Sequence, residues 1–298
     1  MSHKKTGREM KLLIDAGNTR IKWALVEGMT RRAQASGAGL PSSRLLPQSA
    51  VLASNESEAD GEEWICRGEL PTGLADKLSR FIAEQFAQLS PNASLHDIKQ
   101  IWVSNVAGED VSRNILEFGT GISAQSHFVV ARESQCGVRN GYSRASQLGS
   151  DRWTALVSAW HIVKGKCLVV NSGTATTVDA LSGQGEFIGG LILPGVELMR
   201  RSLVESTNQL KPMEGEYMPF PLNTADAIFS GAIQATCGAI ERQYSLLDDD
   251  SVPLLLSGGT ADILQQYFNR KPFKMPPRVV GDLVLRGLLV MAQELNGQ

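Results

Sequence analysis

Two stretches of the chain share one pattern: LLIDAGNTRIKWAL, from Leu12 to Leu25, and LVVNSGTATTVDAL, from Leu168 to Leu181. In each stretch an apolar run ends in a carboxylate or an amide, and a glycine turn leads into a second apolar run. Apolar runs separated by such a turn predict a pair of strands. Because Gly17 aligns with Gly173, the pattern indicates an internal duplication. We therefore expect an α/β protein built from two similar halves.

The two glycine turns are suited to binding phosphate. A residue without Cβ lets the backbone turn tightly and approach a ligand oxygen, and successive N–H groups at such a turn bind anions. Asp15 offers a charge for Mg²⁺, usually through water, because Mg²⁺ keeps much of its hydration shell. Either turn alone could be an ordinary hairpin, so this prediction depends on the repeat. Side-chain donors accompany the turns at Asn18, Thr19, Thr174 and Thr176.

A third glycine turn, LLLSGGTADIL from Leu254 to Leu264, lies between a predicted strand and a predicted helix. The first two turns are each followed by a strand, which argues against the P-loop and the dinucleotide fingerprint, where a helix follows. Other predicted strands are Ile101 to Val106 and Glu186 to Leu193. Apolar spacing predicts helices over Leu74 to Leu89, Val111 to Phe118, Leu148 to Val163, Pro194 to Leu203, Thr224 to Leu247, Ala261 to Phe268 and Leu283 to Leu295.

The composition of the chain argues against two classes of function, nucleic-acid binding and membrane spanning. The chain has 298 residues, of which 42% are hydrophobic and 20% charged, and its formal net charge is -2. Without a basic patch, nucleic-acid binding is not expected, and without an apolar run of roughly 20 residues neither is a membrane span. The four cysteines lie far apart and predict reduced thiols in a cytoplasmic protein. We expect an N-terminal extension at residues 1–10, a first half at 11–147 and a second half at 148–298.

Four sequence blocks carry a resemblance to a known family: DAGNT at Asp15 to Thr19, NGYSRASQLGSDRW at Asn140 to Trp153, then GTATTVDAL and GEFIGGLILPG. In this order they resemble the type III pantothenate kinases of the actin/Hsp70/sugar-kinase superfamily, and also the related Bvg accessory factor proteins. The resemblance implies two ribonuclease H-like, actin-like halves with a nucleotide cleft between them. It further implies a cytoplasmic homodimer that uses ATP with Mg²⁺ to convert pantothenate to 4'-phosphopantothenate, the first step of coenzyme A biosynthesis.

The resemblance also implies roles for individual residues. Asp151 would accept the proton of the attacking hydroxyl, although the residues alone favour an acidic side chain that balances a helix dipole. Tyr142 could instead be loop packing, and Lys22 and Arg152 solvated surface cations. The residues implied to contact ATP are Asp15, Ala16, Gly17, Asn18, Thr19, Arg20, Ile21, Lys22 and Thr174. Those implied to contact pantothenate are Tyr142, Gly149, Ser150, Asp151, Arg152 and Thr224, the last across a dimer interface in some members.

One position departs from the family pattern. Asn171 stands where the family usually has an aspartate associated with a monovalent cation, K⁺ or NH₄⁺. An amide oxygen can ligate such an ion but supplies no negative charge. Two alternatives therefore stay open. The first is a nucleotide-binding regulatory or accessory protein with weak or no kinase activity, and the second is another kinase or phosphatase of the superfold.

Overall fold

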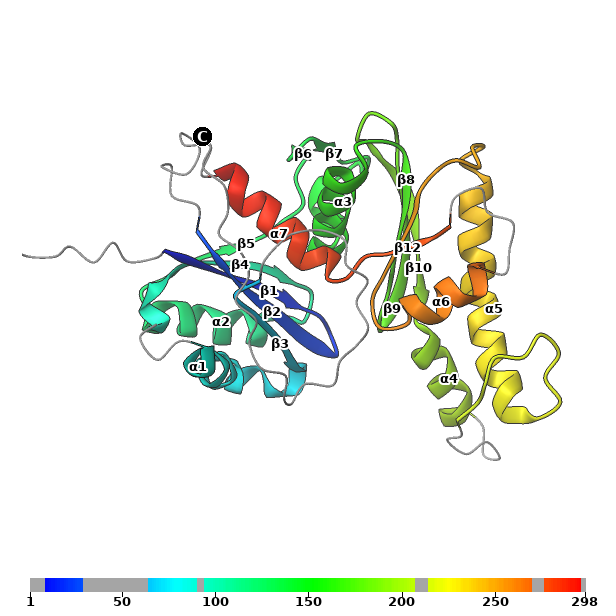
Figure 1. The fold of residues 1–298 in the computed structure, drawn as a ribbon, viewed down its shortest axis with the longest axis horizontal. Coiled ribbons are helices and arrows are strands. Elements are labelled where there is room, and N and C mark those ends of the chain that lie inside the picture. The colour runs from blue at the N-terminus through cyan, green and yellow to red at the C-terminus, as the bar shows by residue number, and fades with distance from the viewer. Residues whose placement is uncertain (1–8, 29–63, 90–93, 207–213, 270–275, 296–298) are drawn as a thin grey trace, which may run out of the picture.

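The computed structural model describes residues 9–28, 64–89, 94–206, 214–269 and 276–295 of the chain (Figure 1). Of the predicted extension at residues 1–10, residues 1–8 lie outside these ranges, and the first strand begins at Met10. In the described ranges, no helix is long and apolar enough to span a membrane.

The first sheet has the strand order β3-β2-β1-β4-β5. Strand β2 is antiparallel to β1 and β3, whereas β4 is parallel to β1 and β5 is parallel to β4. The apolar run in β1 is buried throughout, because helices cover both faces of the sheet. The strands are β1 (Met10–Ala16), β2 (Arg20–Glu27), β3 (Cys66–Pro71), β4 (Ile98–Asn105) and β5 (Gln125–Phe128).

The second sheet repeats this arrangement in the order β10-β9-β8-β11-β12, with the same strand directions. Strand β8 therefore corresponds to β1 and β9 to β2. The duplication predicted from the two glycine turns is confirmed. The strands are β8 (Cys167–Ser172), β9 (Ala175–Leu181), β10 (Phe187–Pro194), β11 (Leu254–Ser257) and β12 (Arg278–Val279).

Helices fill three layers around the sheets (Figure 1). Helices α3 (Ser150–Val163) and α7 (Leu283–Glu294) pack against each other between the sheets, α3 on β8 and β9, and α7 on β1 and β4. The last helix of the chain thus returns to the first sheet. The outer faces carry α1 (Leu78–Leu89) and α2 (Glu109–Gly121) on the first half, and α4 (Val196–Glu205), α5 (Thr224–Ser245) and α6 (Ala261–Phe268) on the second.

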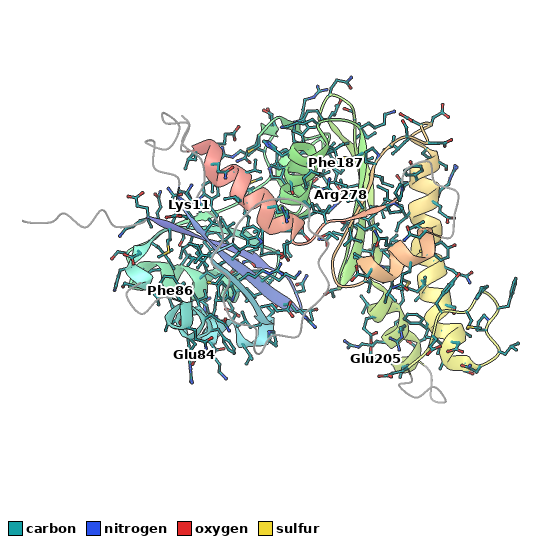
Figure 2. All side chains as sticks on the ribbon, viewed as in Figure 1. Lys11, Glu84, Phe86, Phe187, Glu205 and Arg278 are labelled. Atoms are coloured by element: carbon teal, nitrogen blue, oxygen red, sulfur yellow. The ribbon has the colours of Figure 1, made fainter. Side chains whose placement is uncertain are left out.

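The largest hydrophobic core lies between the sheets and joins both halves. It contains Leu13 of β1, Leu156 of α3, Val169 of β8 and Leu288 of α7, all at most 1% exposed. Figure 2 shows Phe187, another member, near α3, whereas charged side chains such as those of Glu84 and Glu205 lie at the outer surface. Each half also has a core of its own, which lies beneath its outer helices. The central core fixes how the halves meet.

Two predicted helix starts are wrong. Residues Thr72–Lys77 form a 3-10 helix with a kink at Leu74, so α1 begins only at Leu78. Pro194 ends β10, where it pairs with Ala175, and α4 follows with Gly195 as its N-cap. Proline is compatible with either position, and the sheet pairing decides between them.

The short strands were not predicted. Strands β3, β5 and β12 lie toward sheet edges, and their sequences lack a long apolar run. A small hairpin of β6 (Ser134–Gln135) and β7 (Val138–Arg139) turns at Gly137, which has a positive φ of 79°. Two short 3-10 helices, Leu95–Asp97 and Ala145–Gln147, complete the described elements.

Candidate active site

The two repeated glycine turns face each other. The hydroxyl oxygens of Thr19 and Thr174 lie 2.7 Å apart and share a hydrogen bond, although the residues belong to different halves. Each turn is closed by the backbone N–H of its glycine: Gly17 donates to Arg20 O, and Gly173 to Ala175 O, both at 3.0 Å. One predicted phosphate-binding donor of each half, Thr19 and Thr174, is therefore brought to the same place. Thr176, also predicted, is instead fully buried and shares a 3.0 Å hydrogen bond with Ser172 Oγ.

Two other glycines hold the second turn in position. The N–H of Gly195 donates to Thr174 O at 2.9 Å, and a Cβ at Gly195 would lie only 2.1 Å from Gly173 O. Gly258, in the predicted third glycine turn, has a φ of 94°, and a Cβ there would lie 2.3 Å from Ser172 O. Both close approaches require glycine. The third turn therefore packs against the end of β8, beside the second turn.

Asp15 lies at the end of β1, opposite Lys22 in the β1–β2 pairing. Burial raises the pKa of Asp15 from its ordinary value of 3.8 to about 7, the negative charges of Asp151 and Asp282 add to this shift, and Lys22 opposes it. The carboxylates of Asp15 and Asp151 are thus close enough to repel each other. A cation placed between them would relieve that repulsion.

Asp151 stands in the first turn of α3, and its neighbours fix its position. Ser150 Oγ shares a 3.0 Å hydrogen bond with Ser104 Oγ of β4, and Ser104 pairs directly with Asp15 in the parallel β1–β4 register. The start of α3 is therefore tied to the strand next to Asp15. A Cβ at Gly149 would lie 2.6 Å from Asp151 Oδ1, so this N-cap glycine leaves room for the carboxylate.

Arg152 points the other way, into the second half. Its Nε lies 3.2 Å from both carboxylate oxygens of Asp179 on β9, and its Nη1 donates to Tyr142 Oη at 3.0 Å. The side chains of Arg152 and Asp179 are 6% and 3% exposed, so the alternative of a surface cation is wrong for Arg152. Burial raises the pKa of Asp179, and Arg152 opposes that shift. A Cβ at Gly190 would overlap this carboxylate, at 2.1 Å.

Asp179 was missed by the sequence analysis, although one signal was available. It is a lone carboxylate in the apolar run TTVDAL, and a charge in a buried strand needs a partner. The partner, Arg152, is 27 residues away in sequence. The burial pattern of β9 alone could not have identified Arg152 as the partner of Asp179.

Asp282 was also missed. It is the N-cap of α7, with a positive φ of 52°, and it accepts from Lys22 Nζ at 3.1 Å and from Arg67 Nη1 at 2.9 Å. Lys22 is thus held by the helix that returns from the second half, and it is not a solvated strand residue. Arg20 forms an ion pair with Glu69 on β3, which turns its side chain along the first sheet.

The other predicted residues differ in how they can act. Ala16 and Ile21 are fully buried in the core of the first half, so only their backbones could reach a phosphate, whereas Asn18 is exposed. Asn171 lies at the end of β8, in the position that Asp15 has on β1, and we find no hydrogen bond of its side chain to any described residue. Among those residues there is also no cluster of three or more histidine, cysteine or acidic side chains that could hold a metal alone.

Thr224 is not brought to the other predicted substrate residues. It begins α5, after Asn223, whose Oδ1 caps the helix by accepting from Asp226 N at 2.9 Å. Helix α5 lies on the outer side of the second half, away from α3 (Figure 1). Within one chain, Thr224 and Asp151 therefore occupy different surfaces.

Two sheets of identical topology, with facing glycine turns and a carboxylate at the end of β1, define the actin-like class of ATP-binding folds. A solved structure of a Baf family protein from Campylobacter jejuni has the same fold: it superposes with a TM-score of 0.50 at 18% identity, covering 96% of this chain and 100% of that one.

Sequence comparison identifies the family. The type III pantothenate kinase family model matches residues 57–246. A type III pantothenate kinase of Nitrosospira multiformis is 37% identical, over 96% of this chain and 92% of that protein. Another, of Aromatoleum aromaticum, is 38% identical over 96% of this chain and 98% of its own length. The chain belongs to the type III pantothenate kinase family.

Proposed function

We propose that this protein transfers the γ-phosphoryl group of ATP to pantothenate and releases 4'-phosphopantothenate, the first intermediate on the way to coenzyme A. The observation that carries the proposal is the convergence of the two glycine turns, linked by the Thr19–Thr174 hydrogen bond, beside the coupled carboxylates Asp15 and Asp151. Family membership supplies the substrate.

The ATP phosphates would lie against the two turns. The backbone N–H groups and hydroxyls of Thr19 and Thr174 point donors to one place, and Lys22 contributes a cation from β2. Mg²⁺ bound with the nucleotide would neutralise charge that develops on the transferred group. Asp15 suits this ion because a cation would draw its raised pKa back down and relieve the repulsion with Asp151.

Asp151 would orient the pantothenate hydroxyl and accept its proton. Phosphoryl transfer passes through a loose transition state, so positioning and charge neutralisation dominate and the base acts late. The hydrogen bonds of Ser150 to Ser104 and of Thr154 Oγ1 to Ser150 O, at 2.7 Å, make the first turn of α3 rigid. Gly149 and Ser150 would therefore set the position of the base as well as the substrate wall.

Arg152 and Tyr142 would recognise the pantothenate carboxylate. Arginine matches a carboxylate in geometry and charge. Asp179 already occupies Nε and Nη2 of Arg152 and leaves the Nη1 side, where Tyr142 is bonded, for the substrate. We infer that Asp179 positions the guanidinium and that Tyr142 Oη completes the carboxylate site.

A monovalent cation, K⁺ or NH₄⁺, would bind at Asn171. The amide oxygen is an available ligand, but its lack of charge predicts weaker cation affinity than an aspartate would give. Half-activating concentrations of KCl and NH₄Cl, measured in a sodium-free buffer, test this part of the proposal.

We also propose a cytoplasmic homodimer in which Thr224 completes the partner's substrate site. Around Thr224 a groove of about 760 Å³ runs between α4 and α5 and is lined by Met199, Leu203 and Ile228. Leu222 is 100% and Phe220 89% exposed beside it, and such an apolar surface is typical of an interface. Light scattering on Leu222→Asp tests the dimer: we expect a monomer with impaired turnover.

Mass spectrometry of the reaction products tests the proposed reaction. Purified protein, ATP, Mg²⁺ and K⁺ are incubated with pantothenate, or with sugars, acetate or polyphosphate. We expect a phosphorylated product from pantothenate alone. Phosphorylation of another member of the panel would identify a different kinase of the same fold. Tight ATP binding without any product would identify a nucleotide-binding regulatory protein instead.

A further inference from the structure

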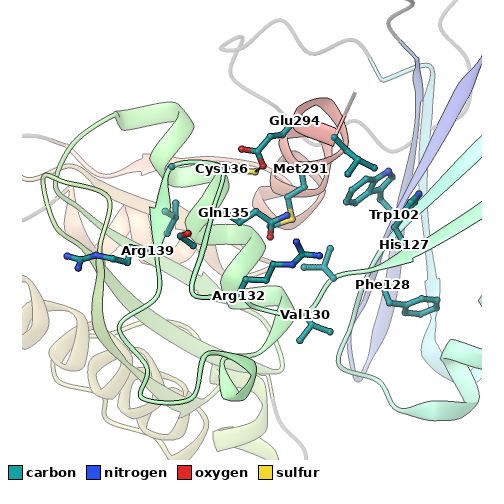
Figure 3. Close-up of a pocket in the computed structure, with 15 residues that line it drawn as sticks. Trp102, His127, Phe128, Val130, Arg132, Gln135, Cys136, Arg139, Met291 and Glu294 are labelled. Carbon is teal, nitrogen blue, oxygen red and sulfur yellow. Dashed lines mark hydrogen bonds between the residues drawn. The ribbon is translucent and has the colours of Figure 1, made fainter. Parts of the chain in front are cut away.

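A second cavity, of about 610 Å³, lies where β5, the β6–β7 hairpin and the C-terminal end of α7 meet (Figure 3). Its volume is in the range of small-molecule sites, which is roughly 300–1,000 Å³. None of the residues assigned above to ATP or pantothenate lines it. The cavity is therefore distinct from the proposed active site.

One wall of the cavity is apolar and aromatic. Trp102 stacks on His127, with ring centroids 4.6 Å apart and an interplanar angle of 19°. Met291 of α7 and Val130, which is 57% exposed, extend this wall. His127 Nε2 is buried without a hydrogen-bond partner among the described residues. A flat or branched apolar group would find matching surface here.

The cavity contains one positive charge that is available to a ligand. Arg132 is exposed and forms no ion pair with another residue of the described ranges. Figure 3 shows its side chain reaching across the cavity toward Trp102 and Met291, whereas Arg139 points away. Arg139 is also already paired, at 2.7 Å from Glu186. The free guanidinium of Arg132 is suited to a carboxylate, sulfonate or phosphate.

The acidic group of the cavity is already engaged. Glu294 Oε2 accepts a hydrogen bond from Cys136 Sγ at 2.9 Å. Burial raises the pKa of this thiol, so Cys136 stays protonated and remains a donor. This hydrogen bond holds Glu294 Oε2 beside Cys136, and Arg132 is the group left to bind an anion.

Both central helices connect this cavity to the proposed active site. Helix α3 begins with Ser150 and Asp151 and ends at the cavity wall, where His161 Nε2 lies 3.1 Å from Cys136 O. Helix α7 begins beside Asp282, the partner of Lys22, and ends with Met291 and Glu294 in the wall. A ligand here would touch the end of α7 directly, at Met291 and Glu294, and would reach the end of α3 through Cys136, which lines the cavity and contacts His161.

We propose that this cavity is an effector site for a compact amphipathic anion, with its apolar body against Trp102 and its acidic group on Arg132. Occupancy would fix the ends of α3 and α7 and so alter the affinity of the distant site for ATP. Binding itself is independent of the proposed function, whereas the coupling to ATP rests on it.

Binding is tested with anilinonaphthalene sulfonate, a fluorescent aromatic anion, on the full-length protein. We expect one saturable site and a Kd raised about tenfold or more in Arg132→Gln, because a charge-assisted hydrogen bond is lost. Val130→Trp, which fills the cavity, should weaken binding similarly. Arg113→Gln on α2 is the matched control: Arg113 is exposed and pairs with Asp110, and its removal should leave Kd unchanged.

Coupling is tested by repeating the titration with saturating ATP and Mg²⁺. We expect the probe to remain bound with an altered Kd, and the probe to change ATP affinity by the same factor. The proposal is overturned if both cavity variants bind the probe as the wild type does, or if ATP displaces it completely. A protein that binds the probe as expected but never phosphorylates pantothenate would overturn the proposed function alone.

Discussion

The two halves of the molecule share their backbone and differ in their charge. Both sheets have the same strand order, and both glycine turns are closed by a 3.0 Å backbone hydrogen bond. Yet the penultimate residue of β1 is Asp15, while that of β8 is Asn171. The two halves therefore share the backbone geometry that we propose for phosphate binding, whereas only the first half carries a carboxylate near the end of its central strand.

The second strand of each half, β2 or β9, also carries a different charge. Strand β2 carries Lys22, which is held by Asp282, whereas β9 carries Asp179, which holds Arg152. On the proposed function, both turns contact phosphate, the first half alone supplies a carboxylate for Mg²⁺, and the second half orients the side chain that binds the pantothenate carboxylate. Substitutions that make the halves more alike test this division of roles.

The largest expected effect comes from Asp15→Asn, which gives the first turn the chemistry of the second. Loss of the charge beside Asp151 should lower kcat/KM at least about 1,000-fold, because charge neutralisation dominates phosphoryl transfer. Steady-state kinetics with ATP and pantothenate measure it. Asp262→Asn, on an exposed part of α6, serves as the control. Activity within tenfold of wild type would assign Asp15 a structural role.

The same substitution should stabilise the free protein. The pKa of Asp15 is raised from 3.8 to about 7, so the folded state holds this proton more tightly than the unfolded chain. Asp15 therefore costs stability as pH rises from about 4 to 7, and the full cost is present above pH 7. Urea unfolding at pH 8 should give Asp15→Asn a gain of about 2–4 kcal/mol, and a smaller gain at pH 5. An equal change at both pH values would contradict the burial of this charge.

Next in size is Asp179→Asn in the second half. The guanidinium of Arg152 would lose its buried partner and turn away, so KM for pantothenate should rise about 10- to 100-fold while kcat changes less. KM for ATP should stay near the wild-type value, and a general loss of folding would lower the apparent kcat without raising KM for pantothenate. Asp179→Glu, which keeps the charge, should recover part of the loss. Equal changes in both KM values would remove Asp179 from substrate positioning.

The smallest expected effect belongs to Asn171→Asp, which gives the second half the carboxylate of the first. The added charge should lower the half-activating concentration of K⁺ about three- to tenfold, since ligand charge tunes cation affinity. Kinetics across a KCl series at constant ionic strength measure it. No shift in that concentration would place the cation away from β8.

Most of the fold could be predicted from the sequence because the decisive signals are local. The glycine turns, the long apolar strands and helices such as α5 and α6 each carry their own pattern. The starts of α1 and α4 were wrong because Leu74 and Pro194 are compatible with two local structures, and only sheet pairing chooses between them. Short edge strands such as β12 depend on a neighbour rather than on their own residues.

The candidate site was predictable only in part, for a similar physical reason. Asp15, Asp151 and the turn residues lie in motifs, and the structure brings these together. Asp179 and Asp282 act through partners 27 and 260 residues away, and no local pattern encodes such a contact. The boundary proposed between 147 and 148 and the roles assigned to the site residues, including Asp15, Asp151, Thr224 and Asn171, stay predictions.

The most direct test of the account is Asp151→Asn, measured for both turnover and pantothenate binding. Asp151 lies where the two halves meet: its charge acts on Asp15 of the first sheet, and the next residue, Arg152, binds Asp179 of the second sheet. We predict that kcat falls about 100- to 10,000-fold, as for loss of a general base, while calorimetry shows pantothenate still bound in the presence of ATP. Turnover equal to that of the wild type would exclude Asp151 as the base of the reaction.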